Sequence, residues 1–267
     1  MREAHVLQVH DLRKEFGDFV AVDDVTFSLA EGGSLAVVGE SGSGKTTTAR
    51  MIAGLETPSG GHIVVAGDER RPGRLRSRER RARGRQVQMV FQDPYSSLDR
   101  RQRVRDAVAE AVALHQHLPA DRLRARVAEL FDMVGLDDRQ AGSLPRALSG
   151  GQRQRVAIAR ALAAEPRVLI LDEAISALDV SIQAQILGLL ARIRADTGTA
   201  LLFITHDLGA IRHVSDDVLV MQGGKVVEHG SVATVLSDPQ HPYTRRLIAS
   251  LPKPGWTPRR RAREAAA

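Results

Sequence analysis

The chain has 267 residues, of which 43% are hydrophobic and 26% charged, as expected for a soluble globular protein with one large domain or a domain plus a subdomain. It contains no cysteine, which excludes disulfides, thiolate zinc sites and cysteine-ligated iron–sulfur clusters. No apolar run approaches the roughly 18 residues of a membrane span, and the first residues are too charged for a signal peptide. We therefore expect a cytoplasmic location.

The net charge of +6 is concentrated in two segments. Residues 70–85 hold nine arginines and one acidic residue, and the tail contains the run RRRARE at 259–264. Neither run is interleaved with the aromatic residues that stack on bases in nucleic-acid-binding proteins. We expect residues 70–85 to be a solvated or partner-facing charged segment, and we expect no nucleic-acid partner.

The first third of the chain predicts short strands around one helix. Apolar and β-branched runs predict strands at LQVHDL, VDDVTFSL, SLAVV, HIVVAG and QVQMVF, which are residues 7–12, 22–29, 34–38, 62–67 and 86–91. A helix is expected from Lys45 to about Ala53, ended by Gly54.

The remaining segments predict helices first and strands again afterwards. Residues 104–164 are helical in pattern, with one apolar face built from Leu123, Val127, Leu130, Phe131 and Val134. Strand-like runs return at 168–172 and 200–207, and a hairpin at 218–230 turns at Gly223 and Gly224. Strands alternating with helices predict an α/β fold with a mainly parallel sheet and an all-helical insertion.

The stretch GESGSGKTTTAR, residues 39–50, matches the pattern G-x-x-x-x-G-K-[ST] between a predicted strand and a predicted helix. Glycines let backbone N–H groups converge on a phosphate, and the helix N-terminus adds its positive end. Lys45 would reach the β- and γ-phosphates of ATP, and the Thr46 hydroxyl would bind Mg²⁺. The residues predicted to surround the phosphates are Gly39, Glu40, Ser41, Gly42, Ser43, Gly44, Lys45, Thr46 and Thr47. The alternative is a glycine-rich turn that binds nothing.

A second acidic anchor for Mg²⁺ is expected at the end of a buried strand, and VLILDE at 168–173 provides it. Asp172 would hold Mg²⁺ directly or through water. Glu173 follows it and could act as the general base that polarises the attacking water. The alternative for this pair is an acidic strand end beside a turn.

These motifs are joined by others that resemble ABC-type ATPases. LSGGQRQR, Leu148–Arg155, resembles the signature sequence of that family, and Gln92 in VFQD resembles its Q-loop glutamine. SALD, residues 176–179, resembles the D-loop, and His206 in FITHD resembles the switch histidine. The resemblance covers roughly residues 6–230. It implies an ATP-binding core at 6–92 and 160–230, which is a P-loop NTPase (RecA-like) fold with antiparallel strands at its N-terminus. It also implies an inserted α-helical subdomain at 93–159 and a C-terminal tail at 231–267.

The resemblance also implies residue roles. Phe16 would stack on adenine, Gln92 would sense Mg²⁺ and the γ-phosphate, and His206 would contact the γ-phosphate. The residues that would complete the nucleotide site of a partner subunit, counted with the cofactor-binding set, are Ser149, Gly150, Gly151, Gln152 and Asp179. Because one chain carries one P-loop and one signature, two half-sites imply a head-to-tail dimer with a second ATPase subunit, either a homodimer or a heterodimer.

Three segments resemble the ATP-binding subunits of peptide and nickel importers: residues 87–101, residues 176–187 and HPYTRRLIASLP at 241–252. This implies a peripheral ATPase on the cytoplasmic face of the cell membrane, acting on separate integral membrane permease subunits and indirectly on an extracytoplasmic solute-binding protein. The candidate permease contacts by analogy are Tyr95, Ser96, Ser97 and Leu98.

Two departures from the family pattern leave the chemistry intact. The chain reads DEA at Ala174 where relatives read DEP, and GKTT where GKST is commoner. Two other functions stay open at this point: a soluble ABC ATPase acting on nucleic acid or a cytosolic complex, and the ATPase subunit of an exporter. The sequence does not identify the transported solute.

Overall fold

The computed structural model describes residues 4–70, 76–93, 98–176, 178–212 and 214–250. The predicted permease contacts Tyr95, Ser96 and Ser97 lie outside these ranges. Among the described residues, no helix is both long and apolar enough to cross a membrane.

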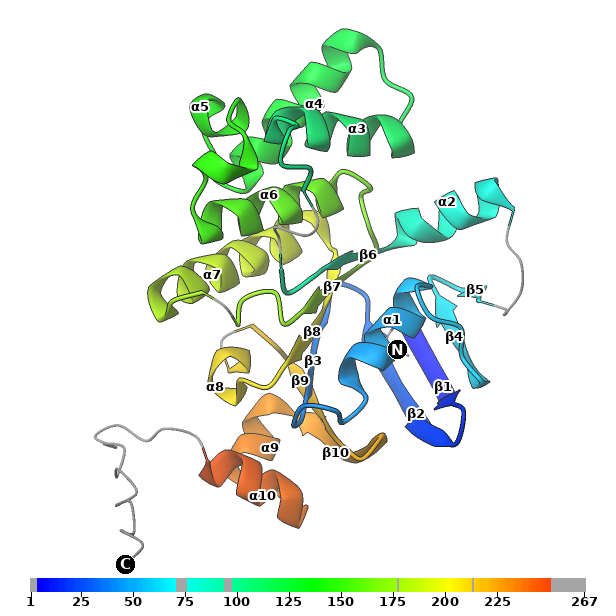
Figure 1. Ribbon diagram of the computed structural model, residues 1–267. Helices are drawn as coiled ribbons and strands as arrows, with labels where there is room; N and C mark the ends of the chain where they lie inside the picture. The colour runs from blue at the N-terminus through cyan, green and yellow to red at the C-terminus, as the bar shows by residue number, and fades with distance from the viewer. Residues whose placement is uncertain (1–3, 71–75, 94–97, 177, 213, 251–267) are drawn as a thin grey trace, which may run out of the picture.

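A six-stranded sheet of order β10-β9-β3-β8-β7-β6 forms the centre of the molecule (Figure 1). Its strands are β3 (Ser34–Val38), β6 (Val87–Val90), β7 (Val168–Asp172), β8 (Ala200–Thr205), β9 (Asp217–Gln222) and β10 (Lys225–Ser231). All neighbours pair in parallel except β9 and β10, which form the predicted hairpin. Gly223 and Gly224 both have positive φ, 57° and 82°, which the tight turn requires.

A second, antiparallel sheet packs beside the first, in the order β2-β1-β4-β5. Its strands are β1 (His5–Phe16), β2 (Phe19–Ala30), β4 (Gly60–Val65) and β5 (Asp68–Glu69). Helix α1 (Lys45–Ala53) lies between the two sheets and ends at Gly54, whose left-handed conformation closes the helix. The predicted bounds of α1 are therefore confirmed. The N-terminal antiparallel strands are confirmed as elements, but β1 and β2 extend beyond the predicted runs at 7–12 and 22–29.

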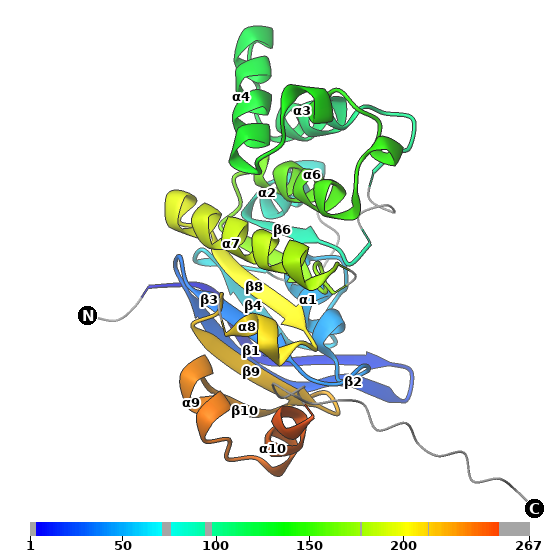
Figure 2. The ribbon, with the colours of Figure 1, turned by 90° about the vertical axis from the view of Figure 1, so that its left-hand side faces the viewer.

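Helices cover the other face of the parallel sheet and extend away from it. The helices beyond the sheet are α3 (Val104–His115), α4 (Ala120–Met133), α5 (Asp138–Ala141), the short 3₁₀ turn Pro145–Ala147 and α6 (Gly150–Leu162). Helix α7 (Val180–Thr197) and the short α8 (Leu208–Ile211) lie along the sheet, while α9 (Val232–Ser237) and α10 (Pro242–Ala249) lie at the opposite end (Figure 2). This arrangement agrees with the predicted helical insertion.

Each strand of the parallel sheet supplies two hydrophobic cores because successive side chains point to opposite faces. On β7, Val168 and Ile170 face the core shared with α1 and the antiparallel sheet. Leu169 and Leu171 face the core shared with α6 and α7. The sheet is thus buried on both faces, as its unbroken apolar strands indicate.

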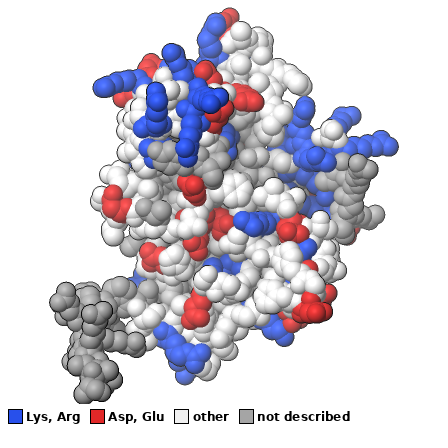
Figure 3. Space-filling model, viewed as in Figure 1, with Lys and Arg blue, Asp and Glu red and all other residues white. Residues whose placement is uncertain are grey.

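The arginine-rich segment contains a helix that the sequence did not predict. Helix α2 (Ser77–Gln86) has no buried residue along its described length, and its arginines gather on the surface in Figure 3. Arg70 is an exception to the predicted solvation, since only 8% of it is exposed. Its guanidinium donates to the Ile52 carbonyl at 2.6 Å and the Arg83 carbonyl at 3.3 Å, and burial lowers its pKa to about 10.

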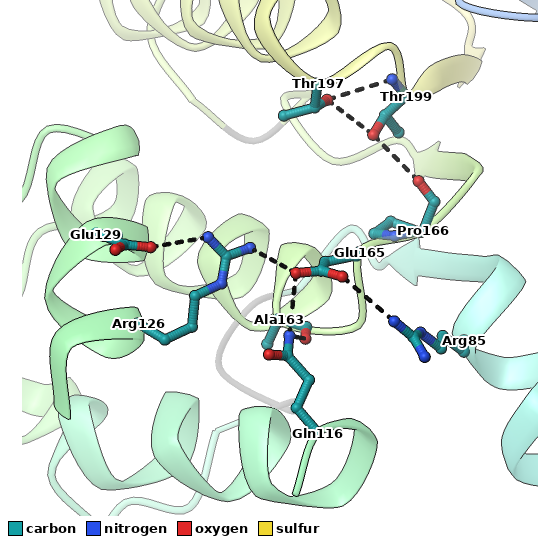
Figure 4. Close-up of polar contacts among 9 residues, drawn as sticks. All are labelled: Arg85, Gln116, Arg126, Glu129, Ala163, Glu165, Pro166, Thr197 and Thr199. Atoms are coloured by element: carbon teal, nitrogen blue, oxygen red, sulfur yellow. Dashed lines mark hydrogen bonds and ion pairs between the residues drawn. The ribbon is translucent and has the colours of Figure 1, made fainter. Parts of the chain in front are cut away.

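Glu165, in the turn between α6 and β7, connects several helices (Figure 4). Its carboxylate lies 3.3 Å from each of Arg85 on α2, Arg126 on α4 and Gln116 after α3. The backbone φ of Glu165 is +52°, a conformation that residues other than glycine adopt with strain. Because Glu165 and Arg85 are half exposed, we expect the ion pair between them to contribute little stability. Arg126 is less exposed, at 22%.

Candidate nucleotide site

The candidate site lies at the carboxyl edge of the parallel sheet, where loops follow neighbouring strands. Val38 at the end of β3 pairs with Thr205 at the end of β8, and Asp172 at the end of β7 pairs with Ile204. The P-loop, His206 and Glu173 therefore leave three adjacent strands at one edge. This is the edge at which ligands bind in open α/β sheets.

The loop between β3 and α1 is pressed against the backbone of two other strands. A Cβ at Gly39 would lie 2.2 Å from the Met221 carbonyl oxygen, and one at Gly44 would lie 2.5 Å from the Ala21 carbonyl oxygen. Gly44 also has φ +97° as the residue before α1. Only glycine fits at these two positions. The loop leads directly into the N-terminus of α1, where free backbone N–H groups and the positive end of the helix form a cradle for phosphate.

Lys45 folds over this loop. Its ammonium donates to the carbonyls of Gly39 at 2.9 Å and Glu40 at 2.7 Å and to the Ser43 hydroxyl at 3.3 Å. Lys45 is only 5% exposed. Burial lowers its pKa, an effect that the nearby carboxylates oppose. The side chain thus brings a buried cation into the cradle.

Thr46 and Asp172 meet across the site. The Thr46 hydroxyl donates to Asp172 Oδ1 at 3.0 Å, and Asp172 is 6% exposed. Burial raises the pKa of Asp172, partly offset by this hydrogen bond. A hydroxyl and a carboxylate are hard oxygen ligands of the kind that Mg²⁺ prefers. These residues therefore fit the ion that the P-loop chemistry requires.

Glu173 follows Asp172 in a strained conformation with φ +48°. Its carboxylate Oε1 lies 3.4 Å from His206 Nδ1, and it is 24% exposed where His206 is 57% exposed. The turn is held by the Glu173 N–H, which donates to the Ile204 carbonyl at 2.9 Å. Backbone strain of this kind clusters at functional sites. Here it accompanies a carboxylate that lines the same pocket as the P-loop residues.

One pocket brings most of the predicted cofactor residues together. It is lined by Phe16, Phe19, Ala21, Ser41, Gly42, Ser43, Gly44, Lys45, Thr46, Thr47 and Glu173. Phe19 was missed by the sequence reasoning, although its position after the Gly17-Asp18 turn beside Phe16 could have indicated it. Phe16 is 49% exposed, and the Lys14 ammonium lies 4.7 Å from its ring centroid. Its predicted stacking on adenine stays a prediction.

Gln92 is connected to the Glu173 turn rather than to the P-loop. Its side-chain amide donates to the Ser176 hydroxyl at 3.4 Å. That hydroxyl in turn donates to the Glu173 carbonyl at 2.9 Å. Ser176 therefore connects the side chain of Gln92 to the turn that carries Glu173.

The signature and D-loop residues start helices away from this pocket. Ser149 caps α6, where its hydroxyl accepts from the Gln152 N–H at 3.3 Å and its N–H donates to the Gln152 side chain at 2.9 Å. Asp179 caps α7, and the Ile182 N–H that it accepts is the main cause of its lowered pKa. None of these residues is among the described residues lining the pocket, so within one chain they do not complete it.

The position of Leu98 disagrees with its prediction as a candidate permease contact. Its side chain is 5% exposed and belongs to the core shared by the helical insertion and the parallel sheet. An apolar side chain beside the Q-loop therefore has a packing role here and presents almost no surface to a partner.

Residues 22–176 match the family model described as ABC transporter. The chain belongs to this family. The match includes the P-loop, Gln92, the signature and Glu173, so the family resemblance inferred from the motifs is confirmed. Phe16, Asp179 and His206 lie outside the matched range, and the roles of individual site residues stay predictions.

Similar proteins refine the placement of this ABC cassette. It is 48% identical over 235 residues to the glutathione import ATP-binding protein GsiA of Escherichia coli (strain K12), covering 87% of this chain and 37% of that protein. It is 46% identical over 243 residues to the oligopeptide transport ATP-binding protein OppD of Mycobacterium bovis, covering 91% and 39%. The chain thus spans less than two fifths of the length of these relatives.

Solved structures confirm the fold class of the cassette. CbiO1 from Clostridium perfringens, part of the ABC transporter complex cbiONQ, superposes with a TM-score of 0.80 at 30% identity, covering 88% of this chain and 92% of that one. The cassette MJ0796, solved as a dimer bound to ADP and Pi, gives 0.74 at 26% identity, covering 85% and 98%. The predicted P-loop core with its helical insertion is therefore the observed fold.

Proposed function

We propose that this protein is the ATP-hydrolysing subunit of an ABC importer for peptides, nickel or a similar small solute. The observation that carries the proposal is the meeting of Lys45, the Thr46–Asp172 pair and the Glu173–His206 pair at one sheet edge. Its substrate class is supported by the 46–48% identity to oligopeptide and glutathione import proteins.

The side chains at this edge have separate tasks in ATP hydrolysis. Lys45 places its ammonium beside the phosphate oxygens, and Thr46 and Asp172 would hold the Mg²⁺ that neutralises phosphate charge. Glu173 accepts a proton from the attacking water at its carboxylate. His206, within 3.4 Å, orients that carboxylate and faces the γ-phosphate.

The active unit is a head-to-tail dimer with a second ATPase subunit, identical or different. In it, Ser149 and Gly150 at the positive end of α6 face the γ-phosphate bound by the partner's P-loop. The cassette MJ0796, which was solved as a dimer bound to ADP and Pi, supports a dimeric unit. Closure on ATP and opening after hydrolysis would move permease subunits at the cytoplasmic face of the membrane, and through them a solute-binding protein. No nucleic acid takes part.

Two substitutions test the ATPase. Glu173→Gln should lower kcat by about 10²–10⁴-fold while nucleotide still binds and an ATP-bound dimer accumulates in size-exclusion chromatography. Lys45→Ala should lose nucleotide binding. Glu165→Gln is the matched control, because Glu165 shares the positive φ, 52° against 48°, at the other end of β7. Turnover at the wild-type rate in Glu173→Gln would contradict the assignment.

A membrane pull-down tests the transporter. Tagged Glu173→Gln protein is incubated with ATP and solubilised membranes of the host, and the co-purifying proteins are identified. Integral membrane subunits, with or without a second ATPase, are the expected result. Recovery of nucleic acid or cytosolic complexes alone would contradict the importer and favour the soluble ABC ATPase.

A further inference from the structure

The HPYT segment, residues 241–244, reaches the nucleotide loop from the far end of the chain. The Glu40 N–H, in the second position of the P-loop, donates to the Tyr243 hydroxyl at 2.9 Å. Tyr243 is 3% exposed, so its ring packs in the hydrophobic core while its hydroxyl meets the loop. These two residues are 203 positions apart in the sequence.

The segment is fixed on the hairpin strand next to it. Glu228 on β10 accepts hydrogen bonds from the Gln240 N–H at 2.7 Å and the His241 N–H at 3.0 Å. His241 caps α10, since its Nδ1 accepts from the Tyr243 N–H at 3.2 Å. The cap holds the backbone of Tyr243, so the position of its hydroxyl depends on His241.

The peptide unit that joins Gly39 to Glu40 is held on both sides. Its N–H, that of Glu40, donates to Tyr243, and its carbonyl, that of Gly39, accepts from the Lys45 ammonium at 2.9 Å. Two hydrogen bonds therefore connect helix α10 to Lys45. Without the tyrosine hydroxyl, this peptide unit is free to rotate, and the Gly39 carbonyl that orients Lys45 turns with it.

We propose that Tyr243 is a positioning residue for the nucleotide loop, and that the HPYT segment sets the affinity of this cassette for a nucleoside triphosphate through the Gly39–Glu40 peptide unit and Lys45. The inference rests on the proposed nucleotide site. It assigns a function to the HPYT segment, which contains none of the proposed catalytic residues. A tyrosine with a merely structural task would affect stability and leave nucleotide affinity unchanged.

Tyr243→Phe removes one hydroxyl and keeps the buried ring. We expect the Kd for Mg-ATP to rise about two- to tenfold, the range for one hydrogen bond. The KM for ATP should rise by the same factor, with kcat within about twofold of wild type, because Tyr243 acts on the site through the Glu40 N–H and is not one of the proposed catalytic residues. Ser237→Ala is the matched control. It removes a hydroxyl of α9 that donates to the Ala233 carbonyl, so affinity should not change.

A pair of substitutions at the cap separates positioning from packing. His241→Ala removes the acceptor for the Tyr243 N–H and should weaken Mg-ATP binding as Tyr243→Phe does. His241→Asn supplies a side-chain oxygen that caps helices well and should restore affinity. Affinities are measured by titration calorimetry, and KM and kcat by an ATPase assay, on the full chain and well below the melting temperature of each variant.

The outcomes separate the two proposals. A wild-type protein that binds no Mg-ATP would contradict the proposed function itself. A wild-type protein that binds, with Tyr243→Phe equally tight or His241→Asn as weak as His241→Ala, would overturn the positioning role alone. Weakening by Ser237→Ala would overturn it as well, since any disturbance of the C-terminal helices would then suffice.

Discussion

Gly150 and Gly151 are neighbours in the first turn of α6, but they have different surroundings. A Cβ on Gly151 would lie 2.6 Å from Ile182 Cγ2 on α7, closer than real side chains approach. A Cβ on Gly150 would lie 3.4 Å from Leu178 Cδ2, an ordinary contact. We therefore predict that Gly151 is required for packing and that Gly150 is free to serve the nucleotide of a partner subunit.

The magnitudes follow from these contacts. Alanine favours a helix by up to about 1 kcal/mol over glycine, while forcing Ile182 aside costs about 1–3 kcal/mol. Gly151→Ala should thus lose about 0–2 kcal/mol, and the melting temperature should fall by a few degrees for a chain of this size. Gly150→Ala should melt at or above the wild-type temperature, yet lose ATP turnover because its methyl group covers the N–H cluster of the signature.

Scanning calorimetry and an ATPase assay on both variants test this account. The double variant Gly151→Ala with Ile182→Ala should be no less stable than Ile182→Ala alone, because removal of Cγ2 removes the clash. The coupling energy between the two changes should be about 0.5–3 kcal/mol. If Gly151→Ala melts with the wild type while Gly150→Ala melts lower, the steric reasoning is wrong.

Three further substitutions test the energetics of the fold and the site. Burial raises the pKa of Asp172 above its ordinary value of 3.8. The ionised carboxylate therefore lowers the free energy of unfolding at pH values above 3.8. Asp172→Asn should therefore raise stability by about 0.5–2 kcal/mol at pH 7, a gain that disappears in thermal unfolding as the pH falls below 3.8. Arg70→Met should lose about 1–3 kcal/mol in urea unfolding, because the end of α1 loses a buried donor, whereas the exposed control Arg80→Met should change stability by less than about 0.5 kcal/mol. Glu165→Gly should be neutral within about 1 kcal/mol in the same assay, since relief of the positive φ offsets the loss of two partly exposed ion pairs.

Local patterns predicted the parts of the molecule that local forces determine. The bounds of α1 follow from Gly44 and Gly54, whose left-handed conformations begin and end the helix. The strand ending in Asp172 is apolar throughout because both faces of the sheet are covered. Parallel strands bring the residues that follow them to one edge, so the P-loop and Glu173 meet there. His206 was predicted at the same site only through its resemblance to the switch histidine of the family.

Contacts between distant segments could not be predicted in this way. Arg70 belongs to a run of charges that reads as solvated, and its burial depends on carbonyls of α1 and α2. Tyr243 reads as one more apolar residue of an amphipathic tail, and its hydroxyl finds Glu40 only after α10 packs at the end of the sheet. Leu98 stands in a segment resembling a docking loop, but its side chain turns into the core. Burial of each residue is a property of the assembled fold.

The close approach of Gly39 to Met221 and of Gly44 to Ala21 has an evolutionary consequence. At both positions a side chain would collide with a backbone carbonyl of β9 or β2, so glycine is required whether or not the loop binds a ligand. A descendant of this chain that had lost its nucleotide would keep them to remain folded. Gly42 is different, because space around it is open and only its φ of +81° favours glycine. Lys45 and Thr46 are held by side-chain hydrogen bonds and not by a steric limit on the backbone. They would therefore be substituted before the two glycines, and their identity is the better record of whether a relative still uses ATP.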